Sequence, residues 1–477
     1  MTEERKQTQV SIMATRSLST ASVQEQEEAK RPSIPTNIAK FILHQWLIIA
    51  FGLACLLAYL FPQVAKHGGI IKAENSILYG AVAFIFLMSG LSIAKDKLLK
   101  HVLNFRLHAK TQGVSFLIIP AIMCGLVRLI DVTDHAGKID RAVLAGYTVL
   151  ACLPTTIASN VVMTRAAGGD EEAALVEVFL ANVLGPFITP GWAVTLMPRT
   201  PAFEVWQESN KDLKGMYESV FKRLGLSVFL PLIVGQVVRW MWAEKIVWAM
   251  QKLHLAKLST VCLILVIWAS FSTCFSTGAL KSLSSQTLIF ITLLNVGFYI
   301  ALTGISFLIA HPPSALVPRQ KRPRTAMPTP TTSTKAKLKS LPHAFLSCLI
   351  NQSPPVETIA ICFCGPAKTT SLGIPMVYAM YPTVDLLLVA KLTVPVILYT
   401  TEQIFCAHFM VRLFKWWGKK REAKWKGKER SGSLAGCDLQ RLSPNVRTGS
   451  GTSGIHGERN GVNAAAERGE GQLKEIG

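Results

Sequence analysis

Apolar residues occur along this chain in runs of about 20, separated by short polar connections. A helix of about 20 residues, rising 1.5 Å per residue, crosses a hydrocarbon layer of about 30 Å. The pattern therefore predicts an all-α polytopic membrane protein with ten transmembrane helices. The predicted spans are roughly 40 to 62, 76 to 94, 112 to 130, 141 to 164, 173 to 197, 224 to 243, 259 to 280, 287 to 310, 356 to 379 and 384 to 413.

Two of these spans are interrupted by proline and polar residues. The fourth contains LPTTIASN, starting at Leu153, and the ninth contains CGPAKTTSLGIP, from Cys364 to Pro375. Because every backbone polar group in hydrocarbon needs a partner, such a stretch indicates a broken helix facing protein or water. The freed N–H groups suit an anion and the freed C=O groups suit a cation. The breaks occupy corresponding places in spans one to five and six to ten, which predicts two inverted five-helix repeats with a binding site at their interface.

The candidate site residues come from the two breaks and from the fifth span. Lys368 is a mid-span charge that costs about 2.5 to 3.5 kcal/mol to insert, so it must face the bundle interior. It is either a pin for the carbonyls of a neighbouring broken helix or a contact for a substrate anion or a coupled proton. Asn160 and Asn182 either contact an ion or substrate or hydrogen-bond between helices; for Ser159 alone, packing is favoured. The predicted substrate or ion site comprises Thr155, Thr156, Ser159, Asn160, Asn182, Lys368, Thr369 and Thr370.

Charge placement predicts the orientation. The formal net charge is +21 and half the residues are hydrophobic. Lysines and arginines gather in alternate connections and in KWWGKKREAKWKGKER after the last span, which places both termini in the cytoplasm and argues against a nucleic-acid partner. The connections after odd-numbered spans then face outward, and among them the mixed-charge stretch 198–223 has room for a short amphipathic helix.

The non-membrane regions divide the chain further. Residues 1–39 form a polar cytoplasmic tail, 40–413 the membrane domain, and 414–477 a basic and then Gly- and Ser-rich cytoplasmic tail. Within the membrane domain, 312–355 is a Pro-, Thr- and Lys-rich insertion. Its composition favours a disordered cytoplasmic loop, and an intron read through in the gene model is the alternative.

The sequence lacks the motifs that are typical of enzymes and metal sites. The sequence contains no nucleophile motif, no Gly-rich phosphate loop and no C-x-x-C pair, and most of the ten cysteines lie in predicted spans as small packing residues. We therefore expect neither an enzyme nor a resident cofactor or metal. The expected partners are the lipid bilayer and a small-molecule or ion substrate.

The stretch ASNVVMTRAAGGDEEAALVEVFLANVLGPFITPGW resembles the fourth and fifth helices of the bile acid:sodium symporter family. TIAICFCGPAKTTSLGIPM is similar to the ninth helix of the symporter-like branch found in fungi and animals. The resemblance implies a core domain and a panel domain, with unwound fourth and ninth helices that cross at the site. It matches Ser159 and Asn160 to a sodium-binding pair and places Asn182 near a fifth-helix ligand. Phe363 and Ala367 stand where sodium-coupled members have acidic and amide ligands, and Lys368 follows; since a fixed cation replaces a bound one, this argues against sodium coupling.

The branch also implies a function. Its members are linked to restraint of cellular calcium uptake, and the fungal ones favour the plasma membrane. Together with Lys368 and the freed helix N-termini, this predicts a small-organic-anion carrier or sensor that negatively regulates calcium uptake. The alternative is a non-transporting membrane regulator whose basic tail binds anionic lipid or a regulatory partner.

Overall fold

A computed structural model of the 477-residue chain describes residues 46–209, 212–313 and 351–441. The predicted N-terminal tail, most of the insertion at 312–355 and the end of the C-terminal tail lie outside these residues. Contacts divide the chain into two units, Met1–Glu422 and Ala423–Gly477. The description below concerns the first unit.

The described residues form helices and no strand. Most are α-helices, and three short segments are π-helical. The first half of the chain contains α3 (Trp46–Leu60), α4 (Pro62–Ala65), α5 (Ala73–Asn75), η1 (Ser76–Ala81), α6 (Val82–Ser92), α7 (Lys95–Val102), α8 (Phe105–Gly113), η2 (Val114–Ile118), α9 (Ile119–Thr133), α10 (Arg141–Cys152), α11 (Ala158–Ala166) and α12 (Glu171–Leu196). They are followed by the 3₁₀ turn η3 (Pro201–Phe203), α13 (Glu204–Ser209), α14 (Leu213–Leu224), η4 (Gly225–Phe229), α15 (Leu230–Met241), α16 (Ala243–Lys252), α17 (Leu255–Ser276), α18 (Ala279–Ser282), α19 (Ser285–Ala310), α21 (Pro355–Cys364), α22 (Thr370–Met380) and α23 (Leu386–Arg441).

Seven helices in the described part of the chain are long and apolar enough to cross a membrane. They are Ala73–Ser92, Phe105–Thr133, Glu171–Leu196, Leu213–Met241, Leu255–Ser276, Ser285–Ala310 and Leu386–Arg421. The first predicted span corresponds to α3, which is shorter. The fourth and ninth are each divided, into α10 with α11 and α21 with α22. The protein is thus a helical membrane protein, and its ten-helix inverted repeat stays a prediction.

Several helix boundaries differ from the sequence-based expectation. The third span begins at Phe105 instead of about 112, and the sixth begins at Leu213 instead of about 224. Most of the second half of the expected outward connection 198–223 is therefore helix α14. Its buried residues Met216, Val220 and Leu224 recur every four positions, so its apolar face packs although its composition is mixed.

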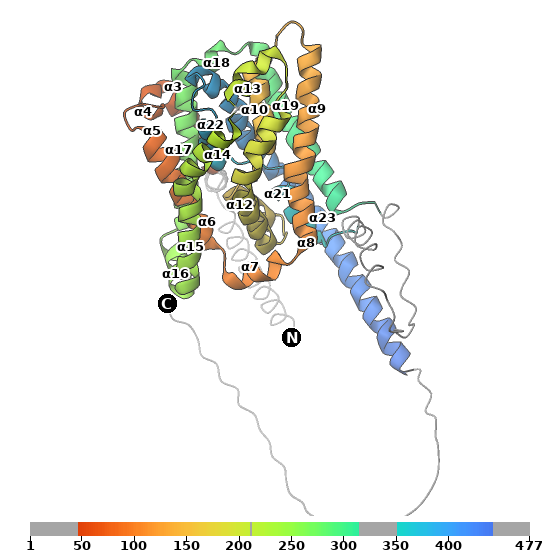
Figure 1. Ribbon diagram of the computed structural model, residues 1–477. Coiled ribbons are helices and arrows are strands. Elements are labelled where there is room, and N and C mark those ends of the chain that lie inside the picture. The colour runs from red at the N-terminus through yellow and green to blue at the C-terminus, as the bar shows by residue number, and fades with distance from the viewer. Residues whose placement is uncertain (1–45, 210–211, 314–350, 442–477) are drawn as a thin grey trace, which may run out of the picture. The chain divides into compact units, whose positions relative to one another are not determined.

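The helices α3, α17, α6 and α15 pack against one another (Figure 1). At the contact between α6 and α15, Gly90 and Gly235 face each other. A Cβ on Gly90 would collide with the carbonyl oxygen of Leu232, and one on Gly235 with that of Leu87. Only glycine allows the two backbones to come this close.

Replacing Gly90 with Ala should therefore lower the thermal unfolding midpoint of the detergent-solubilised protein. The extra methyl group forces α6 and α15 apart, at a cost of about 1 to 3 kcal/mol. Gly80→Ala is the matched control, since a Cβ at Gly80 meets nothing within 4 Å. Equal midpoints for the two variants would contradict the close contact.

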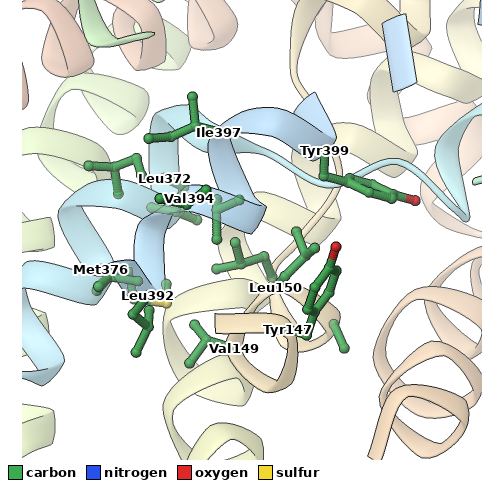
Figure 2. Close-up of a cluster of buried hydrophobic side chains, with 14 of the residues drawn as sticks. Tyr147, Val149, Leu150, Leu372, Met376, Leu392, Val394, Ile397 and Tyr399 are labelled. Carbon is green, nitrogen blue, oxygen red and sulfur yellow. The ribbon is translucent and has the colours of Figure 1, made fainter. Parts of the chain in front are cut away.

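A second packed region surrounds the divided helices. Figure 2 shows side chains of α10, α22 and α23 in one buried hydrophobic cluster, with Leu150, Leu372 and Val394 among them. On the same helices, Gly146 of α10 lies against the carbonyl of Leu392 and the ring of Pro395 in α23. The first half of one divided helix, the second half of the other and the last helix thus form one packed unit.

Candidate functional site

The two helix breaks meet in space. The first lies between Cys152 at the end of α10 and Ala158 at the start of α11, and the second between Cys364 and Thr370. The backbone N–H of Thr369 donates to the carbonyl of Pro154 at 2.9 Å. A direct main-chain hydrogen bond therefore joins the two breaks.

Four consecutive carbonyls at the first break have specific donors. Residues 152 to 155 follow or end α10, so their carbonyls lack the N–H groups that a continuous helix would supply. In hydrocarbon each unsatisfied carbonyl would cost several kcal/mol. The donors are Thr189 Oγ1 to Cys152 O at 2.7 Å, Lys368 Nζ to Leu153 O at 2.8 Å, Thr369 N to Pro154 O at 2.9 Å, and Asn182 Nδ2 to Thr155 O at 3.1 Å.

Lys368 also reaches a third helix. Its side chain is buried, and Nζ donates to the carbonyl of Ser115 at 2.9 Å and lies 3.2 Å from Ser115 Oγ. Ser115 belongs to the π-helical segment η2, where the N–H of Ile119 bonds to Val114. A π-helical partner for the Ser115 carbonyl would be residue 120, which is a proline without N–H. The local sequence thus frees the carbonyl that the lysine binds.

The second break is held by α23. The side-chain amide of Gln403 pairs with the backbone of Lys368, accepting from its N–H at 2.9 Å and donating to its C=O at 2.8 Å. Tyr399 OH donates to the carbonyl of Pro366 at 2.9 Å. Thr400 and Thr370 form a short hydroxyl–hydroxyl contact. One face of α23 therefore fixes the conformation of this break.

Polar side chains of the first break bond mainly to one another and to α12. Asn160 Nδ2 donates to Thr155 Oγ1 at 2.5 Å, and Thr156 Oγ1 lies 2.7 Å from Ser159 Oγ. The ring of Pro154 lies where a Cβ on Gly185 would stand, so the glycine lets α12 approach the break. Asn182 keeps its Oδ1 buried without a hydrogen-bond partner in the described structure.

The amino-terminal ends of α11 and α22 face a common pocket. Neither N-cap residue, Ile157 or Thr369, accepts a side-chain capping bond from its helix. Residues 156–159 and 369–371 line a narrow pocket of about 20 Å³, together with residues of α6, α17 and α23. Two helix N-termini with partial positive charge therefore point toward one space.

The predicted site residues divide into two groups. Thr156, Ser159, Thr369 and Thr370 line the pocket. Thr155, Asn160, Asn182 and Lys368 do not line it but are buried behind it. For Lys368 the contacts are those of the pin that holds the carbonyls of a neighbouring broken helix, which was one of the two sequence-based alternatives.

Sequence reasoning missed the residues that hold the breaks from other helices. Thr189, Tyr399, Gln403 and Ser115 all contact break residues and were not predicted. The available signal was TEQ within the tenth span, because polar residues in an apolar span usually have buried partners.

A second polar cluster was also missed. Glu177 of α12 is fully buried, with Oε1 2.6 Å from His108 Nδ1 and Oε2 accepting from Gln112 Nε2 at 2.7 Å.

No group of three or more His, Cys, Asp or Glu side chains that could hold a metal ion occurs among the described residues. The oxygen atoms at the breaks are instead hydroxyls, amides and carbonyls.

Comparison with known proteins places this architecture in a family. The chain belongs to the SBF-like CPA transporter family, whose model matches residues 45–416. It is 36% identical to the solute carrier RCH1 of Candida albicans over 399 residues, which are 82% of this chain and 93% of that protein. It is also 36% identical to the solute carrier RCH1 of Saccharomyces cerevisiae over 400 residues, 83% and 89% of the two chains. The mouse sodium/bile acid cotransporter 7 is 26% identical over 383 residues, 79% of this chain and 94% of its own. The expected family resemblance is confirmed, and the relatives are transporters, not enzymes.

Proposed function

We propose that this transporter carries or senses a small organic anion at the pocket between the two helix breaks. One observation carries the proposal. The carbonyl side of the breaks is satisfied by protein donors, including the ammonium of Lys368, whereas the two uncapped N-termini of α11 and α22 face the pocket. A site with its cation already built in and its N–H groups facing the ligand favours an anion.

The same arrangement bears on the coupling ion. Lys368 Nζ lies within 2.9 Å of two carbonyls, in the position a bound cation would take between the carbonyl end of α10 and η2. A tethered amino group occupies this position. We therefore infer that transport does not need sodium, although the names of the animal relatives refer to it.

We further propose that the protein resides in the plasma membrane with both termini in the cytoplasm and restrains calcium uptake there. The orientation rests on the alternating basic connections. The calcium role rests on the fungal and animal branch that the sequence resembles. In this proposal, ligand binding at the pocket controls the restraint on calcium uptake.

The experiment is a cytosolic calcium recording after an extracellular calcium pulse, in cells that lack the protein. Wild type should reduce the transient. Thr369→Val should do so less well, because Thr369 lines the pocket, where its hydroxyl contacts Ser371 Oγ at 2.9 Å, while its backbone bond to Pro154 remains. Losing one hydrogen bond to the ligand, worth about 1 kcal/mol, should weaken occupancy about fivefold.

Thr292→Val is the matched control. Thr292 is exposed on α19, and its hydroxyl donates to the carbonyl of Leu288 in the same helix at 3.1 Å. It should behave as wild type. A fully active Thr369→Val would remove the pocket from the function, and equal transients with and without the protein would refute the calcium role.

A further inference from the structure

The last span contains an acidic residue at the level of the helix breaks. Glu402 of α23 directly precedes Gln403, whose amide bonds to the backbone of Lys368 in the second break. A glutamate side chain is too short to reach the membrane surface from this depth. The carboxyl group of Glu402 therefore lies within the hydrocarbon layer.

The groups that face this carboxyl are polar but uncharged. From α19 the side-chain amide of Asn295 faces it, from α10 the phenol of Tyr147, and along α23 the thiol of Cys406. A phenol and a thiol are ordinarily neutral at pH 7. In the part of the chain that the structure describes, no lysine, arginine or histidine forms an ion pair with Glu402.

Hydrogen bonds do not replace the missing cation. The Tyr147 hydroxyl donates to Asn295 Oδ1 at 2.8 Å and so is directed to the amide instead of the carboxyl group. Glu402 Oε2 and Asn295 Nδ2 are both buried, and neither has a hydrogen-bond partner among the described residues. One oxygen of the carboxyl group is thus removed from water without any donor.

Glu177 shows what this chain supplies to a buried carboxylate elsewhere. Its two oxygens meet His108 Nδ1 at 2.6 Å and Gln112 Nε2 at 2.7 Å. Glu402 has neither an imidazole nor a bonded amide. A carboxylate buried without such partners is strongly disfavoured, and the group takes up a proton instead.

We propose that Glu402 is a proton-binding site within the membrane. Its carboxyl group is neutral in this conformation and releases the proton only when α23 parts from α10 and α19 far enough to admit water. Because the next residue, Gln403, holds the second break, the same movement changes the contacts of that break. This link to the pocket rests on the proposed function, whereas proton binding itself does not.

The first test uses dicyclohexylcarbodiimide, an apolar reagent that modifies protonated carboxyl groups and reaches them from lipid. Glu402 is half-buried and shares one side of α23 with the exposed rings of Phe405 and Phe409, so it borders the lipid. With the full-length protein in lipid vesicles at neutral pH, mass spectrometry should find the adduct on Glu402. Labelling should fall about tenfold for each pH unit above the point at which the carboxyl group ionises.

Asp385 is the matched control at the other end of the same helix. It is exposed, and its carboxylate accepts from the N–H of Leu387, so at neutral pH it should be ionised and stay unlabelled. Equal labelling of Asp385 and Glu402 would overturn the proposal. No label on Glu402, or labelling that does not change with pH, would do so as well.

The second test measures the unfolding midpoint in detergent against pH. If the folded chain holds a proton on Glu402 that the unfolded chain releases above about pH 4.3, wild type should lose stability as the pH rises. Glu402→Gln resembles the protonated group and cannot ionise. Between about pH 5 and pH 9, its midpoint should therefore rise relative to wild type by a few degrees.

Glu218→Gln, at an exposed position on α14, should keep a constant difference from wild type over the same range. A constant difference for Glu402→Gln, or a variant that becomes less stable than wild type as the pH rises, would refute proton binding at Glu402. Neither test uses transport or calcium, so failure here is distinguishable from failure of the proposed function.

Discussion

Replacing Lys368 with Met should abolish the proposed restraint on calcium entry and also lower the thermal stability of the purified protein. Methionine fills similar space but leaves the carbonyls of Leu153 and Ser115 without their donor. Each buried acceptor left unsatisfied costs about 1 to 3 kcal/mol. The loss of charge should also weaken the junction of the two breaks. The measurements are the calcium transient per molecule of folded protein and the unfolding midpoint in detergent.

Lys110 provides a matched control. It is equally buried, at 1% exposure, and its Nζ donates to Asn351 O at 2.7 Å and Ser353 Oγ at 3.0 Å. It lies away from the breaks. Lys110→Met should lower stability to a similar degree while the folded protein keeps its activity. Retained activity in Lys368→Met, or an equal loss in both variants, would contradict a specific role for Lys368.

Replacing Gln403 with Leu should destabilise the second break and lower the stability of the protein about as much as Lys368→Met does. The amide satisfies both the N–H and the C=O of Lys368, and leucine satisfies neither. The expected cost is about 1 to 3 kcal/mol for each orphaned group, read as a lower unfolding midpoint.

The neighbouring Thr401 gives the comparison for this prediction. Its hydroxyl bonds to Ile397 of the same helix at 3.2 Å, so Thr401→Val should cost little. If Gln403→Leu and Thr401→Val unfold at the same midpoint, the amide of Gln403 does not hold the break.

The breaks could be located from sequence because proline and hydroxyl residues are costly in a span, and the structure is non-helical at both places. The residues that donate hydrogen bonds to the breaks could not be identified from sequence. Thr189 and Gln403 are single polar residues on long helices, and periodicity gives the face of a helix but not the helix that it meets. The sequence allows an internal pin and a ligand contact equally for Lys368, and the atoms that its Nζ contacts are known only from coordinates.

The early start of the sixth span was missed for a different reason. Its first turns carry both charge signs, which composition alone assigns to a connection. The spacing of Met216, Val220 and Leu224 contained the helical signal, and reading periodicity before composition would have recovered it.

The hydrogen bond from Thr369 N to Pro154 O has a mechanical consequence. Lys368 Nζ also bonds to Leu153 O, and Gln403 bonds to Lys368 O. The two divided helices are therefore held together at their breaks. In any cycle that preserves these bonds, the unwound segments travel as a single rigid body. Access to the pocket would then change when this body slides against α6 and α17, which also line the pocket. The breaks would move together with the bound ligand and would not act as hinges.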